Sequence, residues 1–167
     1  NDHHFKDTYE MIINTINNCP KPEVKELDQY AEKCVVRSYF DIIPDLLMEG
    51  ASINNILNLF CKSNNEVGIE YILEFSYINV NATLNNTTPL EYCLNNKNHL
   101  GCILLIKNDS INLQAIDSKS ATGETILHTS CRLGLSKVVS YLLRNFLYDV
   151  NLPTKDGVFP IHFACLS

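Results

Sequence analysis

The chain has 167 residues, of which 46% are hydrophobic, and its formal net charge is −6. A chain of this length fits one domain that buries a core without a metal or disulfides, and its hydrophobic content excludes a wholly disordered polymer. The 13 lysine and arginine residues are scattered, which argues against a protein that follows nucleic-acid phosphates, and no apolar run is long enough to span a bilayer.

The first predicted element is a helix near the N-terminus. In the stretch FKDTYEMIINTINNC, apolar residues at positions 5, 9, 12, 13 and 16 follow helical spacing, and Cys19-Pro20 ends the pattern. We expect residues 1–20 to form a helix that caps one end of a stack of helices, as terminal segments do in repeat proteins.

A proline conflicts with the next helical pattern. Pro44 lies inside YFDIIPDLLMEG, and a proline in a helix interior costs about 3 kcal/mol. Two interpretations stay open: either a helix begins at Pro44 as its first turn, or the helix is kinked there.

A β-branched residue followed by asparagine recurs along the chain after predicted helices. Asparagine can bond its own backbone and turn the chain, so we predict a projecting turn at each pair. The pairs are Ile53-Asn54, Val80-Asn81, Ile111-Asn112 and Val150-Asn151.

Two phrases with the same residue order lie in the last third of the chain. TILHTSC spans residues 125–131, and FPIHFAC spans residues 159–165. Self-similarity with a period of about 20–50 residues is typical of repeat architectures. The sequence therefore predicts stacked units.

One unit can be followed through GETILHTSCRLGLSKVVSYLL, residues 123–143. Thr125 is a candidate N-cap, because its hydroxyl can accept an N–H of the first helical turn. Gly134 is expected to end this helix, because glycine tolerates a left-handed conformation. A second apolar pattern follows at Val138, Val139, Leu142 and Leu143. Two short helices joined in this way form an αα-hairpin.

These phrases resemble the T-P-L-H-x-A opening of ankyrin repeats. TTPLEYC at 87–93 keeps the threonine, proline and leucine, TILHTSC keeps the threonine, leucine and histidine, and FPIHFAC keeps the proline and histidine. MEGASIN at 48–54 and YDVN at 148–151 are similar to the close of the family's unit. The resemblance covers residues 24–167, most strongly from residue 87 onward. It implies an all-α, ankyrin-type αα-hairpin solenoid with short projecting β-turns or hairpins.

The resemblance also implies a domain organisation. The N-terminal helix, residues 1–20, is followed by an ankyrin repeat domain, residues 21–167. We place units at about 24–54, 55–86, 87–121 and 122–156, with a partial unit at 157–167. Residues 114–124, QAIDSKSATGE, are expected to be an expanded loop. Because the last unit has a first helix and no second one, we expect a fragment of a longer protein.

Seven cysteines, an odd number with no C-x-x-C pair, argue against a secreted disulfide framework. We expect free, mostly buried thiols in an intracellular protein of the cytoplasm or nucleus.

Histidine and cysteine recur together in the repeated phrases. His128 lies three residues before Cys131, which permits a Cys–His nucleophile and leaves a cysteine hydrolase as one alternative. The same pair recurs as His162 and Cys165, however, and enzymes rarely duplicate a dyad in register. We therefore expect structural histidines, small apolar cysteines, no catalytic residue, no cofactor and no metal.

The function that the resemblance implies is protein–protein recognition on a concave face and its projecting turns. The partner is expected to be another protein or peptide, with no direct nucleic-acid binding and no membrane insertion, and the chain is expected to be a monomer by itself. The alternative is a regulatory or substrate-recruiting ankyrin segment of a larger enzyme or transporter. Transferring the family's contact positions gives the candidate partner-binding residues Asn85, Glu91, Asn95, Asp117, Lys119, Glu124, Thr129, Arg132, Lys155 and Asp156.

Overall fold

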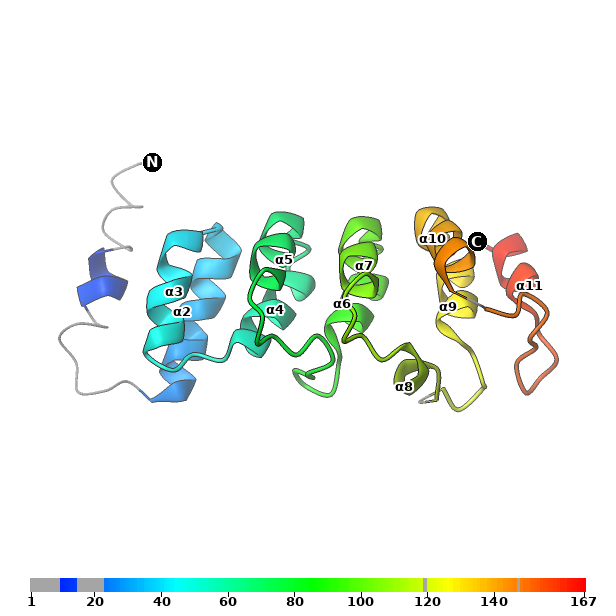
Figure 1. Ribbon diagram of the computed structural model, residues 1–167, viewed down its shortest axis with the longest axis horizontal. Helices are drawn as coiled ribbons and strands as arrows, with labels where there is room; N and C mark the ends of the chain where they lie inside the picture. The colour runs from blue at the N-terminus through cyan, green and yellow to red at the C-terminus, as the bar shows by residue number, and fades with distance from the viewer. Residues whose placement is uncertain (1–9, 15–22, 119, 147) are drawn as a thin grey trace. The chain divides into compact units, whose positions relative to one another are not determined.

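The computed structural model describes residues 10–14, 23–118, 120–146 and 148–167 (Figure 1). Across these ranges the regular elements are helices, and the only pairing of extended residues is an isolated bridge between Leu84 and Thr87. The all-α prediction is therefore confirmed. Contacts divide the chain into two compact units, Asn1–Ile78 and Asn79–Ser167, and each is described by itself.

The first unit contains two helical pairs. They are α2 (Val24–Arg37) followed by the 3-10 turn η1 (Phe40–Ile42) and α3 (Ile43–Met48), and then α4 (Ile53–Lys62) and α5 (Glu66–Leu73). Helix α4 packs against both α2 and α5. Residues 10–14 are also helical, but the rest of the helix predicted over 1–20 lies outside the described residues.

Pro44 fits the first of its two interpretations. It lies in the first turn of α3, where its missing N–H would have no partner within the helix. The turn predicted at Ile53-Asn54, in contrast, is wrong. Ser52 is the N-cap of α4 and its side chain accepts the Asn55 N–H at 3.3 Å, so both residues of the pair lie in the first turn of the helix. The predicted boundary between residues 54 and 55 consequently falls inside this helix.

The second unit contains α6 (Pro89–Asn95), α7 (His99–Ile106), α8 (Leu113–Ser118), α9 (Ile126–Arg132), α10 (Ser136–Asn145) and α11 (Pro160–Cys165). Helix α6 pairs with α7, α9 lies between α10 and α11, and α10 also contacts α7 (Figure 1). This is the αα-hairpin arrangement that the sequence predicts.

Small polar residues and glycine set the helix ends. Asn65 and Asn98 cap α5 and α7, and each side chain accepts an N–H from a glycine three residues later, at 2.9 and 2.7 Å. Gly134 follows α9 with a φ of +71°, as predicted for a helix-ending glycine.

The segment expected to be an expanded loop, residues 114–124, is not irregular throughout. Its first part belongs to α8, which begins at Leu113, a residue that is only 8% exposed. Burial of this leucine fixes the segment against the unit, and α8 contacts α9.

Candidate functional site

A groove of about 400 Å³ lies between α6 and α9 in the second unit. Helix α6 and the turn before it form one side, and α9 with the segment before it forms the other. The lining residues are Asn86, Thr87, Glu91, Leu94, Asn95, Ser120, Glu124, Thr125, Ile126, Thr129 and Arg132.

Five of the ten predicted contact residues line this groove. They are Glu91, Asn95, Glu124, Thr129 and Arg132. They lie on two helices and one turn that are separated in the sequence, and the αα-hairpin packing brings them together.

Glu91 is held in place by the start of its own helix. Its Oε2 atom accepts the Thr88 N–H at 2.6 Å and the Thr88 hydroxyl at 2.8 Å, and the Glu91 N–H donates to the Thr88 hydroxyl at 3.2 Å. This reciprocal arrangement is a capping box. The Glu91 carboxylate therefore caps the start of α6, and it also presents a fixed negative edge to the groove.

The two repeated histidines lie three residues after the N-caps of their helices, as Glu91 does in α6. His128 Nδ1 accepts the Thr125 N–H at 3.1 Å, and His162 Nδ1 accepts the Phe159 N–H at 3.1 Å. The Thr125 hydroxyl also lies 2.9 Å from His128 Nδ1. Because a backbone N–H only donates, Nδ1 of each ring must be unprotonated in this geometry. Thr125 is the N-cap of α9, as predicted.

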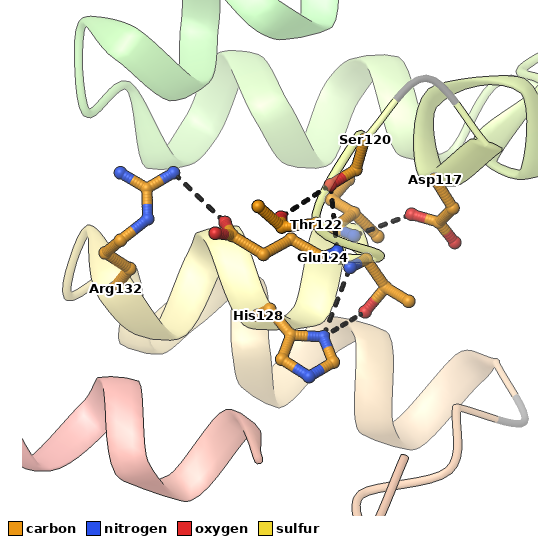
Figure 2. Close-up of polar contacts among 8 residues, drawn as sticks. Asp117, Ser120, Thr122, Glu124, His128 and Arg132 are labelled. Carbon is orange, nitrogen blue, oxygen red and sulfur yellow. Dashed lines mark hydrogen bonds and ion pairs between the residues drawn. The ribbon is translucent and has the colours of Figure 1, made fainter. Parts of the chain in front are cut away.

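The wall that precedes α9 is fixed by side chains from the end of α8 and from the segment that follows it (Figure 2). Asp117 Oδ1 accepts the Ile126 N–H at 2.6 Å, Ser120 Oγ accepts the Glu124 N–H at 2.9 Å, and the Ser120 and Thr122 hydroxyls are 3.0 Å apart. Burial raises the pKa of the Asp117 carboxyl above its ordinary value, while the hydrogen bond from Ile126 opposes this effect. Burial also raises the pKa of Tyr148, whose hydroxyl lies 3.4 Å from Asp117 Oδ2.

An ion pair lies on the α9 side of the groove. Arg132 Nη2 lies 3.4 Å from Glu124 Oε2, as Figure 2 shows. The arginine side chain is 49% exposed and the glutamate side chain 21% exposed. An exposed pair of this kind contributes roughly 0–1 kcal/mol to stability, so a partner carboxylate can compete for the arginine at little cost.

The other predicted contact residues lie outside the groove lining. Asn85 is exposed in a turn with a φ of +52°, next to the groove residue Asn86. Lys155 Nζ donates to the Ala121 carbonyl at 2.8 Å, and Asp156 is exposed in the same turn. Asp117 supports α9, as described, and Lys119 lies outside the described residues.

The sequence reasoning missed six residues of the lining: Asn86, Thr87, Leu94, Ser120, Thr125 and Ile126. Most of them lie in the turns that precede the two helices. The sequence could have indicated these turn residues, because they lie next to Asn85 or in or beside the 114–124 segment.

The environment of Cys131 bears on the alternative of a Cys–His nucleophile. The six described cysteines are thiols that form no disulfide, and five of them are buried. Burial raises the pKa of Cys131, the opposite of the shift that a nucleophilic thiolate needs. Within the described ranges, no group of three histidine, cysteine or acidic residues is placed to hold a metal ion.

Residues 122–152 match the family model of the ankyrin repeat. This match covers α9, α10 and most of the groove wall on the α9 side, although Ser120 lies outside it. An ankyrin repeat implies a protein-binding module. No curated protein matches the chain. None of the helices in the described part of the chain is long and apolar enough to cross a membrane.

Proposed function

We propose that the chain recognises another protein by binding a polypeptide segment in the groove between α6 and α9. The observation that carries this proposal is the convergence of five predicted contact residues on one groove. Its rim offers hydrogen-bonding side chains such as Asn95 and Thr129, and its wall offers the guanidinium of Arg132. Such a surface suits a segment with backbone amides and at least one acidic side chain.

The fixed geometry of the groove supports tight recognition. Its carboxylate edge at Glu91 and its wall at Ser120 and Glu124 already make hydrogen bonds before any partner arrives. A preorganised surface loses little conformational entropy on binding, which leaves more of the contact energy for affinity.

We also propose that this function involves binding without chemistry. The hydrogen bond to Thr125 occupies His128 Nδ1, and the raised pKa of Cys131 disfavours its thiolate. A free-thiol composition fits an intracellular protein, and the acidic chain fits a protein or peptide partner better than a nucleic acid.

The test uses peptides selected from a random display library on the full chain and measured by calorimetry. The Thr129→Arg variant places a long side chain in the groove and should weaken binding at least about tenfold, a change of about 1.4 kcal/mol. The matched control is Gln29→Arg, which adds the same side chain at an exposed position of α2. Selected peptides that bind Thr129→Arg as tightly as the control would contradict the proposed groove.

A further inference from the structure

A second groove, of about 450 Å³, lies between α7 and α10 and shares no residue with the groove between α6 and α9. Helix α10 packs against α7, so the two second helices of neighbouring hairpins form its sides (Figure 1). Its lining residues are Ile103, Ser136, Lys137, Ser140, Tyr141, Arg144 and Asn145.

The groove is basic in an acidic protein. Lys137 and Arg144 line it, and Lys107 at the end of α7 places its Nζ atom 6.0 Å from the centroid of the Tyr141 ring. No aspartate or glutamate is among the lining residues. A local excess of cations on a chain with a net charge of −6 produces a field that attracts anionic ligands.

No ion pair within the described part of the chain neutralises these three cations. Neither of the ion pairs Lys62–Glu32 and Arg132–Glu124 involves Lys107, Lys137 or Arg144, and no carboxylate of the described residues is found within 4.0 Å of these three cations. All three side chains are exposed. They therefore keep their donors for a ligand.

The spacing fits an elongated ligand. Lys137, Tyr141 and Arg144 lie four and three residues apart along α10, which places them in a row on one side of the helix. Exposed Ser136 and Ser140 flank this row with hydroxyl groups, and Ile103 with the half-buried Tyr141 gives it an apolar floor.

We propose that the α7–α10 groove is a second docking surface and that its occupant is an acidic polypeptide segment, in which carboxylates alternate with apolar residues. The carboxylates pair with Lys107, Lys137 and Arg144, and the apolar residues contact Ile103 and Tyr141. The charge complementarity and the mixed polar and apolar lining carry this assignment. A flexible anion such as a nucleic acid needs a longer basic track than three cations supply.

The probe is a fluorescein-labelled octapeptide in which glutamate alternates with leucine, titrated with the full chain by fluorescence anisotropy. The wild-type chain should bind it, more weakly at high salt because added salt screens exposed charges. The Lys137→Glu/Arg144→Glu variant should lose at least about tenfold in affinity, which is the loss expected for two reversed charge contacts. The same peptide with glutamine in place of glutamate should not bind.

The matched control is Lys25→Glu/Lys97→Glu, which makes the same change in net charge at two exposed lysines outside this groove. Equal weakening in both variants, or no binding by the wild-type chain, overturns the proposal. Tighter binding to an eight-nucleotide single-stranded DNA or to anionic vesicles in the same assay overturns the choice of a polypeptide. The Thr129→Arg variant should bind this probe normally, which separates the result from that of the groove between α6 and α9.

Discussion

Replacing Asp117 by alanine should destabilise the second unit, because this side chain holds the groove wall to the start of α9. Its Oδ1 atom accepts the Ile126 N–H at 2.6 Å, one of the N–H groups that a helix cannot satisfy internally. Ile126 is only 1% exposed, so water cannot take over as the acceptor. Leaving such a donor unpaired costs about 1–3 kcal/mol, which is the loss we expect for Asp117→Ala.

Asparagine at the same position should be much better tolerated. It keeps an oxygen acceptor for the Ile126 N–H and removes only the charge. The pKa of Asp117 is raised mainly by burial, so the folded protein disfavours the ionised carboxyl. We therefore expect Asp117→Asn to cost less than about 1 kcal/mol.

The raised pKa of Asp117 also makes the stability of the fold depend on pH in a direction that can be predicted. The pKa in the folded state lies above the unfolded value of 3.8, so the folded chain binds this proton more tightly. The stability gained from protonation is fully present below the unfolded pKa and is lost as the pH rises through the folded pKa. Wild type should therefore gain stability relative to Asp117→Asn as the pH falls from 7 toward about 4.

Urea unfolding followed by circular dichroism measures these differences, and amide hydrogen exchange locates them. In Asp117→Ala, exchange at Ile126 should be about 5–150 times faster, the factor that corresponds to the expected loss. Equal losses in the alanine and asparagine variants, or unchanged exchange at Ile126, would refute the role of this hydrogen bond.

Three further outcomes follow from the packing. Gly68→Ala should destabilise the first unit by about 1–2 kcal/mol, because its new Cβ would overlap the buried Phe60 ring; Phe60→Leu in the same chain should remove most of this loss in a double-mutant cycle. Iodoacetamide at neutral pH should label exposed Cys165 long before Cys34, whose pKa burial raises to about 11, and equal rates in a mass-spectrometric time course would contradict this order. Arg132→Gln should cost less than about 1 kcal/mol in unfolding experiments yet weaken the selected peptides in calorimetry, whereas unchanged affinity would remove this arginine from the proposed contact surface.

Much of the second unit could be predicted because its local signals agree. A threonine at the N-cap, a capping residue three positions later and a glycine after the helix each point to the same boundaries, as at Thr125, His128 and Gly134. The first unit offered a conflicting signal at Ile53-Asn54. The pair follows Ser52, and a serine cap begins a helix as readily as an asparagine makes a turn.

The groove was harder to predict than the helices. Asn95 and Arg132 occupy equivalent positions of successive first helices, and they were proposed by transferring the contact positions of the ankyrin family that the sequence resembles. Ser120 could not be found in this way, because it reaches the groove only through the fold of the segment after α8. Lys155 shows the converse: its position in a projecting turn marked it as a contact residue, whereas its ammonium group bonds the Ala121 carbonyl.

Within the first helices of the repeat, some positions are required for the structure, whereas others can vary and so determine which partner binds. In α6, α9 and α11 the residue three positions after the N-cap, Glu91, His128 or His162, accepts the backbone N–H of that N-cap residue, so in these helices the position is tied to helix formation. Seven residues after the N-cap no such bond is required, and the chain carries Asn95 in α6 and Arg132 in α9. The fold constrains the first position by hydrogen bonding and leaves the second to vary in charge and size. The chemistry of a partner should therefore be read from the ends of the first helices, and a swap of Asn95 and Arg132 should change which peptides bind without changing the fold.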